Sequence, residues 1–542
     1  MIKTVFACVL AAGLTGYGLQ MPLPEPKNVP DLLTTSAGEK VTTVDQWEKV
    51  RAPELLALFE REEYGRRPAA ANERDRVSFD VYDVSEALGG KAVRKLVRVT
   101  YKGPNGIFSF PFTAYIPKTE KPVPAFVLAA NIKRGTLDEK QGLSSVFWPV
   151  EEIVARGYAT AAFRFDVVAA DKKGAGFSQG VFPAVQPESA RDDESWGTLS
   201  AWAWGNSRIL DWMETEPLID AKHVGVVGHS RGGKTAILTA VLDRRFAMAC
   251  SNNSGCSGAK LNHIDLPKSE SIKLILKNFP YWFCRNYRKH AGKEMTMDFD
   301  QHELLALIAP RLLCVASATD DYWAGPRGEW WAAKLASPAW ELYGKKGLVA
   351  DAYPVPEKPQ QEGCVSYHLR KGPHFLAPYD WHRYMDFADR HGWRGCRRTL
   401  WQIGVKDGTG NEFALAPRGY NDFLQHDFGW ENNYFLVGRS DAKKSFPYVL
   451  PGVNDKWAGS GKYSGRRTQQ VNILFDIAKK GAGGAWTLVI DFADVHKMEQ
   501  PLLKVSVNGK PQNSFLVDAR EVLKGGTLEL WMGPEPNREW GL

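Results

Sequence analysis

The segment Val224-Gly-Val-Val-Gly-His-Ser-Arg-Gly-Gly-Lys-Thr-Ala-Ile-Leu-Thr-Ala-Val-Leu242 is the most informative part of this 542-residue chain. It begins with apolar residues typical of a buried strand and ends with a helical pattern from Lys234 to Leu242. Between them lies Gly228-His-Ser-Arg-Gly232, whose glycines permit a sharp turn from a strand into a helix. Such a turn exposes the Ser230 hydroxyl at the end of a sheet, so we interpret Ser230 as a nucleophile. It also puts the backbone N–H of Arg231 at a helix N-terminus, where developing negative charge is stabilised.

A second Gly-x-Ser-x-Gly match, Gly176-Phe-Ser-Gln-Gly180, is a weaker candidate. Lysines and a glycine precede it and prolines follow it, so no strand leads into a helix there. We therefore predict that Ser178 is a loop residue.

Strand and helix patterns alternate on both sides of the Ser230 turn. We expect strands at 125–129, 159–163, 224–227, 246–250 and 312–316, with helices at 199–214 and 234–242. This alternation predicts an α/β-hydrolase fold with a mostly parallel sheet and helices on both faces. Upstream, the pattern indicates a first helix from Trp47 to Glu63 and further strands from Val77, including 97–101 and 111–116.

The pattern changes near Gly395. Turn residues then separate short strands at 471–475, 486–490, 503–507 and 527–531. We therefore expect a hydrolase domain over residues 20–394 and an all-β sandwich domain over residues 395–542.

The N-terminus has the pattern of a secretory signal peptide, which we assign to residues 1–19. Lys3 precedes a short apolar run, and the sequence becomes polar by Gln20. A buried N-terminal helix is the alternative. No later run of about 18 apolar residues follows, so we expect a protein that is secreted or periplasmic and without a membrane span after signal removal.

The composition excludes several functional classes. The net charge of +7 is spread along the chain, which does not favour nucleic acid binding. Seven cysteines form neither a Cys-x-x-Cys pair nor a zinc-like Cys/His spacing, so we expect no metal and no cofactor. Disulfide pairing cannot be read from these positions.

The partners of Ser230 should follow it as an acid and then a histidine. Asp320 and Asp321 come after the strand at 312–316, and either can be the acid. His374 follows a short strand and a Gly-Pro turn, whereas His368 lies within that strand and is expected to bond there. We predict that His374 takes the serine proton while an aspartate orients its other nitrogen. The remaining histidines are interpreted as surface or internally bonded residues: His223, His229, His263, His290, His302, His382 and His391.

Six motifs are distinctive as a set: Trp196-Gly-Thr-Leu-Ser-Ala-Trp-Ala-Trp-Gly205, Gly228-His-Ser-Arg-Gly-Gly-Lys-Thr-Ala236, Ser251-Asn-Asn-Ser-Gly-Cys256, Phe279-Pro-Tyr-Trp-Phe-Cys284, Asp300-Gln-His302 and Ala306-Leu-Ile-Ala-Pro310. Together they resemble the bacterial glucuronoyl esterases, carbohydrate esterase family 15, over about residues 25–394. The resemblance implies cleavage of the ester between 4-O-methyl-glucuronic acid on xylan and an alcohol, as in lignin–carbohydrate esters.

The resemblance also implies roles for individual residues. Ser230 would be the nucleophile and His374 the base, and Arg231 would add its guanidinium to the oxyanion hole. The residues that would bind the substrate are Lys234, which would bond sugar hydroxyls, and Glu270 and Trp323, which would line the uronate site. A solvated helix lysine and a core tryptophan are the structural alternatives for Lys234 and Trp323.

The chain departs from the family pattern at several positions. Asn253 stands where fungal members carry the catalytic Glu, so the acid must come from the later loop, where Asp321 matches better than Asp320. Gly325 replaces the Asp of the usual Trp-Ala-Asp-Pro, and the loop Asn131-Ile-Lys-Arg-Gly-Thr136 differs from the usual Gly-Asn-rich form.

The C-terminal part, from Leu400 through Pro451, resembles the carbohydrate-binding-like β-sandwich of rhamnogalacturonan lyases. This accessory domain would bind polysaccharide or brace the hydrolase domain.

Together these features predict an exported, monomeric, metal-independent serine esterase of plant cell wall degradation, with glucuronoxylan or lignin–carbohydrate esters as substrates. The alternatives are an acetyl-xylan or other carbohydrate esterase with the same triad, an α/β peptidase, and a non-catalytic polysaccharide-binding protein.

Overall fold

The computed structural model describes residues 25–130 and 146–394, with short pieces beyond residue 402 (403–404, 411–415, 433–446, 471–474, 485–487, 504–507, 510–512, 516–518 and 528–531). The chain divides into two compact units, Met1–Arg397 and Arg398–Leu542, which we call the first and second units. The expected signal peptide and the loop 131–136 lie outside the described residues.

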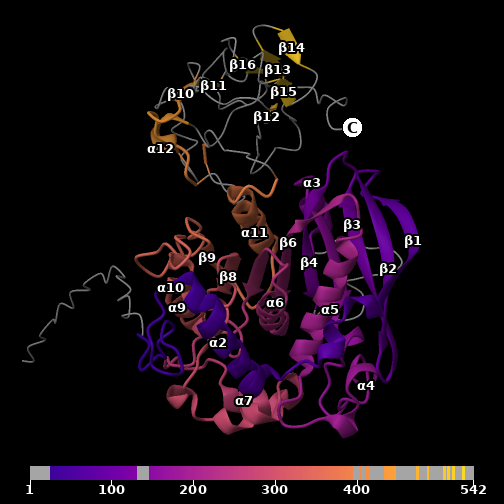
Figure 1. The fold of residues 1–542 in the computed structure, drawn as a ribbon. Coiled ribbons are helices and arrows are strands. Elements are labelled where there is room, and N and C mark those ends of the chain that lie inside the picture. The colour runs from indigo at the N-terminus through magenta and orange to yellow at the C-terminus, as the bar shows by residue number, and fades with distance from the viewer. Residues whose placement is uncertain are drawn as a thin grey trace, which may run out of the picture. The chain divides into compact units, whose positions relative to one another are not determined.

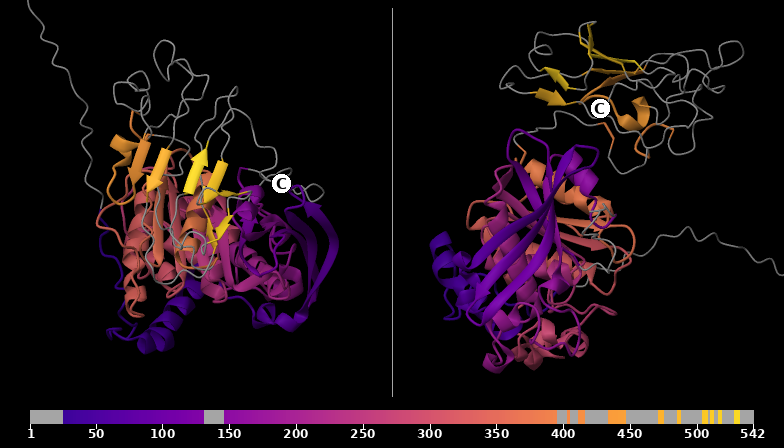
Figure 2. Two further views of the ribbon diagram at one scale, coloured as in Figure 1. Left: turned by 90° about the horizontal axis from the view of Figure 1, so that it is seen from above. Right: turned by 90° about the vertical axis from the view of Figure 1, so that its right-hand side faces the viewer.

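A nine-stranded sheet forms the first unit, in the order β1-β2-β3-β5-β4-β6-β7-β8-β9. The strands from β5 to β9 in this order are parallel neighbours, whereas β1, β2 and β3 join one edge in antiparallel pairing (Figures 1 and 2). The bounds are β1 Val77–Ala87, β2 Ala92–Gly103, β3 Gly106–Pro117, β4 Val123–Ala130, β5 Ala159–Arg164, β6 Ile219–His229, β7 Met248–Asn252, β8 Leu312–Ala318 and β9 Val365–Arg370. The predicted mostly parallel sheet is confirmed, with the strand expected at 246–250 displaced by two residues.

Both faces of the parallel part of the sheet are covered, so β4, β5, β7 and β8 are buried along nearly their whole length, whereas the edge strand β1 is half-buried to exposed. Along β4, Phe126 and Leu128 belong to one core, whereas Val127 and Ala129 belong to the other. Helices α5 and α6 pack on the Val127 face, and α3 and α11 pack on the Phe126 face. The helices of the first unit are α1 Val44–Gln46, α2 Ala52–Phe59, α3 Val150–Ala155, α4 Phe182–Val185, α5 Thr198–Met213, α6 Arg231–Leu242, α7 Ile272–Asn278, α8 Gln301–Ala306, α9 Pro326–Ala336, α10 Pro338–Glu341 and α11 Pro378–Arg390.

The first helix differs from the continuous one predicted for Trp47 to Glu63. Two π-helical turns, Trp47–Arg51 and Glu60–Tyr64, flank α2, so the backbone is helical but widens at both ends of α2. Short 3-10 helices complete the unit at Ala69–Asn72, Arg74–Arg76, Phe165–Val167, Glu188–Ala190, Pro280–Trp282, Arg285–His290 and Glu294–Thr296.

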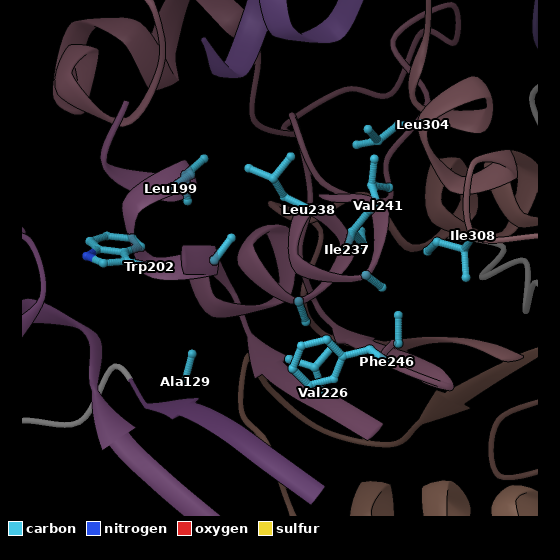
Figure 3. Close-up of a cluster of buried hydrophobic side chains, with 14 of the residues drawn as sticks. Ala129, Leu199, Trp202, Val226, Ile237, Leu238, Val241, Phe246, Leu304 and Ile308 are labelled. Atoms are coloured by element: carbon cyan, nitrogen blue, oxygen red, sulfur yellow. The ribbon is translucent and has the colours of Figure 1, made fainter. Parts of the chain in front are cut away.

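Helix α6, which follows the candidate nucleophile, is held in the centre of the first unit. Figure 3 shows Ile237, Leu238 and Val241 of α6 among side chains from the sheet, α5 and α8. Ile237 is fully buried, and burying such a side chain contributes about 1.5–3 kcal/mol. The N-terminus of α6 is therefore fixed against the carboxyl end of β6.

The second unit contains short strands over its described residues. They are β10 Asn433–Leu436, β11 Val471–Leu474, β12 Ala485–Thr487, β13 Lys504–Val507, β14 Lys510–Gln512, β15 Leu516–Asp518 and β16 Leu528–Trp531, with helix α12 Ala442–Ser445. β10 pairs with β11, β12 with β15, and β13 lies between β14 and β16. The described parts of the four strands expected here are confirmed as β11, β12, β13 and β16.

No helix in the described ranges is long and apolar enough to cross a membrane. The cysteines that the structure describes, Cys250, Cys256, Cys284, Cys314 and Cys364, are all free thiols.

Candidate active site

Ser230 occupies a strained turn between β6 and α6. Its φ of 58° and ψ of −123° lie outside the regions that ordinary residues adopt, at a cost of about 1–3 kcal/mol. The turn is held because the Ser230 N–H donates to the Asn252 carbonyl at 2.8 Å. A Cβ at Gly228 would lie 1.8 Å from the Gly232 carbonyl oxygen, so this glycine is required by close approach. The strand–turn–helix context predicted for Ser230 is confirmed, and Ser178 lies in a loop.

A cavity of about 320 Å³ lies over Ser230. It brings together the predicted residues His374, Arg231, Lys234, Glu270 and Trp323, which come from distant parts of the sequence. Its remaining lining residues are Asn253, Ser254, Gly255, Asn278, Phe279, Trp282 and Ala324. Asp321 does not line the cavity, but it is hydrogen-bonded to His374, which does.

His374 is paired with Asp321 and not with Asp320. The Nδ1–H of His374 donates to Oδ2 of Asp321 at 2.5 Å. Asp320 is exposed and accepts a hydrogen bond from Thr319 Oγ1. Burial raises the pKa of Asp321, but the hydrogen bond and charge of His374 and the hydrogen bond from Asn253 lower it by more. The pKa of Asp321 therefore lies below its usual value, and the carboxylate is ionised at neutral pH.

Asn253 is the second partner of Asp321. Its Nδ2 donates to the same Oδ2 of Asp321 at 2.7 Å. Asn253 follows β7, and Asp321 follows β8, so two neighbouring parallel strands deliver these side chains to one place. Asn253, where the chain departs from the family pattern, thus donates a hydrogen bond to the acid that follows the next strand.

His229, the residue before Ser230, lies against His374. Their ring centroids are 4.4 Å apart, and His229 Nδ1 bonds Asn252 Oδ1 at 2.7 Å. Burial and the neighbouring His374 lower the pKa of His229 to about 3, so its ring is neutral at working pH. The prediction of an internally bonded residue is confirmed, but its contact with His374 was missed. Its position inside the Ser230 turn was the available signal.

His368 behaves as expected for a residue within a strand. It lies in β9, and its Nε2 is 2.8 Å from Oδ1 of the buried Asp380.

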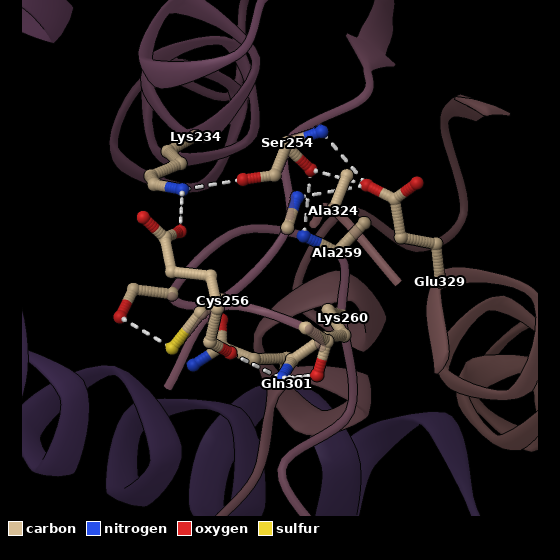
Figure 4. Close-up of polar contacts among 12 residues, drawn as sticks. Lys234, Ser254, Cys256, Ala259, Lys260, Gln301, Ala324 and Glu329 are labelled. Carbon is tan, nitrogen blue, oxygen red and sulfur yellow. Dashed lines mark hydrogen bonds and ion pairs between the residues drawn. The ribbon is translucent and has the colours of Figure 1, made fainter. Parts of the chain in front are cut away.

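Lys234 and Glu270 form a buried ion pair at the floor of the cavity. Lys234 Nζ is 3.2 Å from Glu270 Oε2. The same Nζ donates to the Ser254 carbonyl (Figure 4). Both side chains are less than a tenth exposed, so a solvated helix lysine is the wrong interpretation of Lys234. A fixed cation and carboxylate facing one cavity can both hydrogen-bond a polyhydroxylated ligand.

Glu329 holds the chain segment that forms this floor. Its Oε1 accepts from the backbone N–H of Ser254 at 2.7 Å (Figure 4) and from that of Gly255 at 2.9 Å. Its Oε2 accepts from Ser317 Oγ at 2.6 Å. Complete burial raises the pKa of Glu329 to about 7 despite these bonds.

Trp323 is 46% exposed and lines the cavity, so a core tryptophan is the wrong alternative. Two residues later, Gly325 has a φ of 69°, and a Cβ there would come within 2.7 Å of the Lys260 side chain. Glycine in place of the usual aspartate is therefore explained by backbone conformation and by the packing of Lys260.

The Arg231 guanidinium is held by groups that the sequence reasoning did not identify. It forms an ion pair with Asp171 and lies 4.9 Å from the ring centroid of Phe279 and 4.7 Å from that of Trp282. Asp171 lies in an irregular loop without periodicity, so no sequence signal marked it.

No group of three or more His, Cys, Asp or Glu side chains in the described part of the chain is arranged to hold a metal ion.

Comparison with known proteins finds relatives of both units. The family model described as "Glucuronyl esterase, fungi" matches residues 97–344, and the model described as "Polysaccharide lyase family 4, domain III" matches residues 399–532. A carbohydrate esterase from an unknown prokaryotic organism is 33% identical over 391 residues, which is 67% of this chain and 89% of that protein. A 4-O-methyl-glucuronoyl methylesterase of Thermothelomyces thermophilus is 32% identical over 317 residues, covering 56% and 70%. The solved structure of a glucuronoyl esterase from Solibacter usitatus superposes with a TM-score of 0.62 at 35% identity, covering 67% of this chain and 98% of that one.

The sheet topology and the turn at Ser230 make the first unit an α/β-hydrolase, followed by a β domain of the carbohydrate-binding type. The relatives narrow this class further. Because the chain is similar to a carbohydrate esterase over most of that protein's length, it belongs to the glucuronoyl esterase family, carbohydrate esterase family 15.

Proposed function

We propose that the protein is a serine esterase that hydrolyses esters of 4-O-methyl-glucuronic acid on xylan. One observation carries the proposal: Ser230 on its strained turn shares a cavity with His374, which is bonded to Asp321, and with the buried Lys234–Glu270 pair. The names of the relatives, which are methylesterases of the same uronic acid, support the substrate class.

The first step is attack by Ser230 Oγ on the ester carbonyl carbon. Nε2 of His374 accepts the serine proton, while Asp321 keeps Nδ1 protonated and stabilises the imidazolium that forms. The neutral His229 ring beside His374 adds no positive charge to oppose that imidazolium. His374 then donates its proton to the leaving alcohol oxygen, which leaves an acyl-enzyme on Ser230.

Negative charge on the carbonyl oxygen is stabilised at the start of α6. The first N–H groups of a helix have no intrahelical partner, and that of Arg231 directly follows the nucleophile. The Arg231 guanidinium, which also lines the cavity, supplies a second, charged donor. Water, activated by His374, then releases the uronic acid through the same intermediate in reverse.

The sugar ring is recognised by Lys234, Glu270 and Trp323. Lys234 donates to ring hydroxyls and Glu270 accepts from them, so both polarities are available to a polyhydroxylated ligand. Trp323 presents an exposed aromatic face to the sugar ring at the same cavity.

The proposal extends to the location and organisation of the protein. The signal-like N-terminus supports export to the periplasm or the medium. The domains proposed are the signal over 1–19, the esterase over 20–394 and the accessory carbohydrate-binding domain over 395–542. The match of the C-terminal part to a polysaccharide lyase domain supports the last assignment. The active species is a monomer.

The test is hydrolysis of a benzyl glucuronate ester beside acetylated xylan and an aryl acetate, for the wild type and Ser230→Ala. Turnover of the uronate ester that is lost in the variant is the expected result. Turnover of acetyl esters alone would make the protein an acetyl esterase with the same triad. The absence of any turnover would favour a polysaccharide-binding protein.

A further inference from the structure

Asp171 accepts from three hydrogen-bond donors, two of which belong to residues that line the cavity, Arg231 and Trp282. Its Oδ1 accepts from Tyr281 Oη and from Trp282 Nε1, both at 2.9 Å, and its Oδ2 is paired with the Arg231 guanidinium. The Asp171 side chain is 13% exposed, so these bonds are largely shielded from water. Both oxygens of the Asp171 carboxylate therefore accept hydrogen bonds, and Oδ2 forms the ion pair with Arg231.

Two aromatic rings also confine the Arg231 guanidinium. Phe279 and Trp282 stack on each other with ring centroids 4.0 Å apart and planes within 4°, and both rings lie within 5 Å of the guanidinium carbon. Because Asp171 also bonds Trp282, the same carboxylate fixes the arginine and the aromatic surface on which it lies. An arginine held in this way has few rotamers left to lose when a substrate binds.

We propose that Asp171 is a positioning residue for ester hydrolysis, which acts by holding the Arg231 guanidinium where it meets the developing oxyanion. The inference rests on the proposed role of Ser230 and its turn. Donors that stabilise a transition state are effective when they are oriented beforehand, since no reorganisation is then needed during the reaction. Asp171 itself touches neither the substrate nor the reacting atoms.

The experiment is a double-mutant cycle between Asp171→Asn and Arg231→Ala, with kcat and KM measured separately. Asn keeps the size of the side chain but removes its charge, so the guanidinium is released from its fixed position. We expect Asp171→Asn to lower kcat about 100-fold with little change in KM, as small displacements of a catalytic group do. In the Arg231→Ala background the same change should alter kcat less than about threefold, because the group through which Asp171 acts is absent.

Asp389→Asn is the matched control. Asp389, in α11, also accepts from a tyrosine hydroxyl and from arginines, and its side chain is likewise 13% exposed. It lies outside the cavity lining, so its substitution should affect thermal stability while leaving kcat unchanged.

A reduction of kcat by the same factor in both backgrounds would overturn the proposal, as would a change in KM alone, because Asp171 would then only support the cavity wall. If Asp171→Asn does not fold, Asp171→Glu keeps the charge, and the same non-additivity is required of it. The cycle is measured on an aryl acetate as well as on the uronate ester. Failure of the uronate ester alone refutes the proposed substrate, whereas an additive cycle on the acetate refutes the role of Asp171.

Discussion

Glu329→Gln isolates the free energy that a buried acid contributes to the stability of the cavity floor. Glu329 is completely buried, and its contacts suit a neutral side chain as well as an ionised one. Oε1 of Glu329 accepts from two backbone N–H groups. Oε2 accepts from Ser317 Oγ when the acid is ionised and can donate to the same Oγ when it is protonated. Glutamine reproduces the protonated acid, because its carbonyl oxygen accepts and its NH₂ donates.

The magnitude follows from the raised pKa. Burial moves the pKa of Glu329 from 4.5 to about 7, and each pH unit of this displacement is worth about 1.4 kcal/mol, which gives about 3 kcal/mol in total. Because the folded pKa lies above the unfolded one, this stability is fully present below pH 4.5. It falls as the pH rises from 4.5 to 7 and is absent above that range. The glutamine variant has no such dependence.

The assay is urea unfolding of the wild type and Glu329→Gln at pH 4.5 and pH 8. The free energy of unfolding of the variant, minus that of the wild type, should increase by about 3 kcal/mol between these pH values. Burial also raises the pKa of both Glu63 and Glu303 to about 8, but these groups titrate in both proteins and cancel in the difference. A difference that is the same at both pH values would refute the reasoning, since Glu329 would then ionise without a penalty.

Three further predictions test other parts of the site. Asp321→Asn should lower kcat about 10⁴-fold at constant pH while Asp320→Asn leaves it unchanged, and equal losses in steady-state assays of the two would contradict the pairing. Gly228→Ala should cost more than about 3 kcal/mol because the new Cβ has no room, so a thermal unfolding midpoint like that of the wild type would show that the turn can relax. Trp323→Ala should raise KM for a glucuronate ester about tenfold with kcat nearly unchanged and have no effect on an aryl acetate, whereas weaker turnover of both esters would indicate a structural role.

The parts of this protein that the sequence predicted are those encoded locally. The turn at Ser230, the strands beside it and α6 depend on glycines and apolar spacing within about twenty residues, and the structure reproduces them. His374 was identified for the same reason, because a strand and a turn precede it directly.

The parts that remained open depend on contacts between distant segments. Asp320 and Asp321 are adjacent, and the way in which the chain leaves β8 decides which carboxylate faces His374. An exposed Trp323 and a buried one look alike in a sequence. Asp171 lies 60 residues before its partner Arg231, and only the folded chain brings the two together.

The meeting of two strand ends behind His374 also has an evolutionary meaning. Asn253 Nδ2 lies 2.7 Å from the very oxygen of Asp321 that bonds the histidine, so a carboxylate at either position would reach nearly the same point. A lineage can therefore move its acid from one strand to the next through an ancestor that carries both, without displacing the nucleophile or the base. An acid after β7 and an acid after β8 would thus be exchangeable solutions to one geometry, and this chain carries the second.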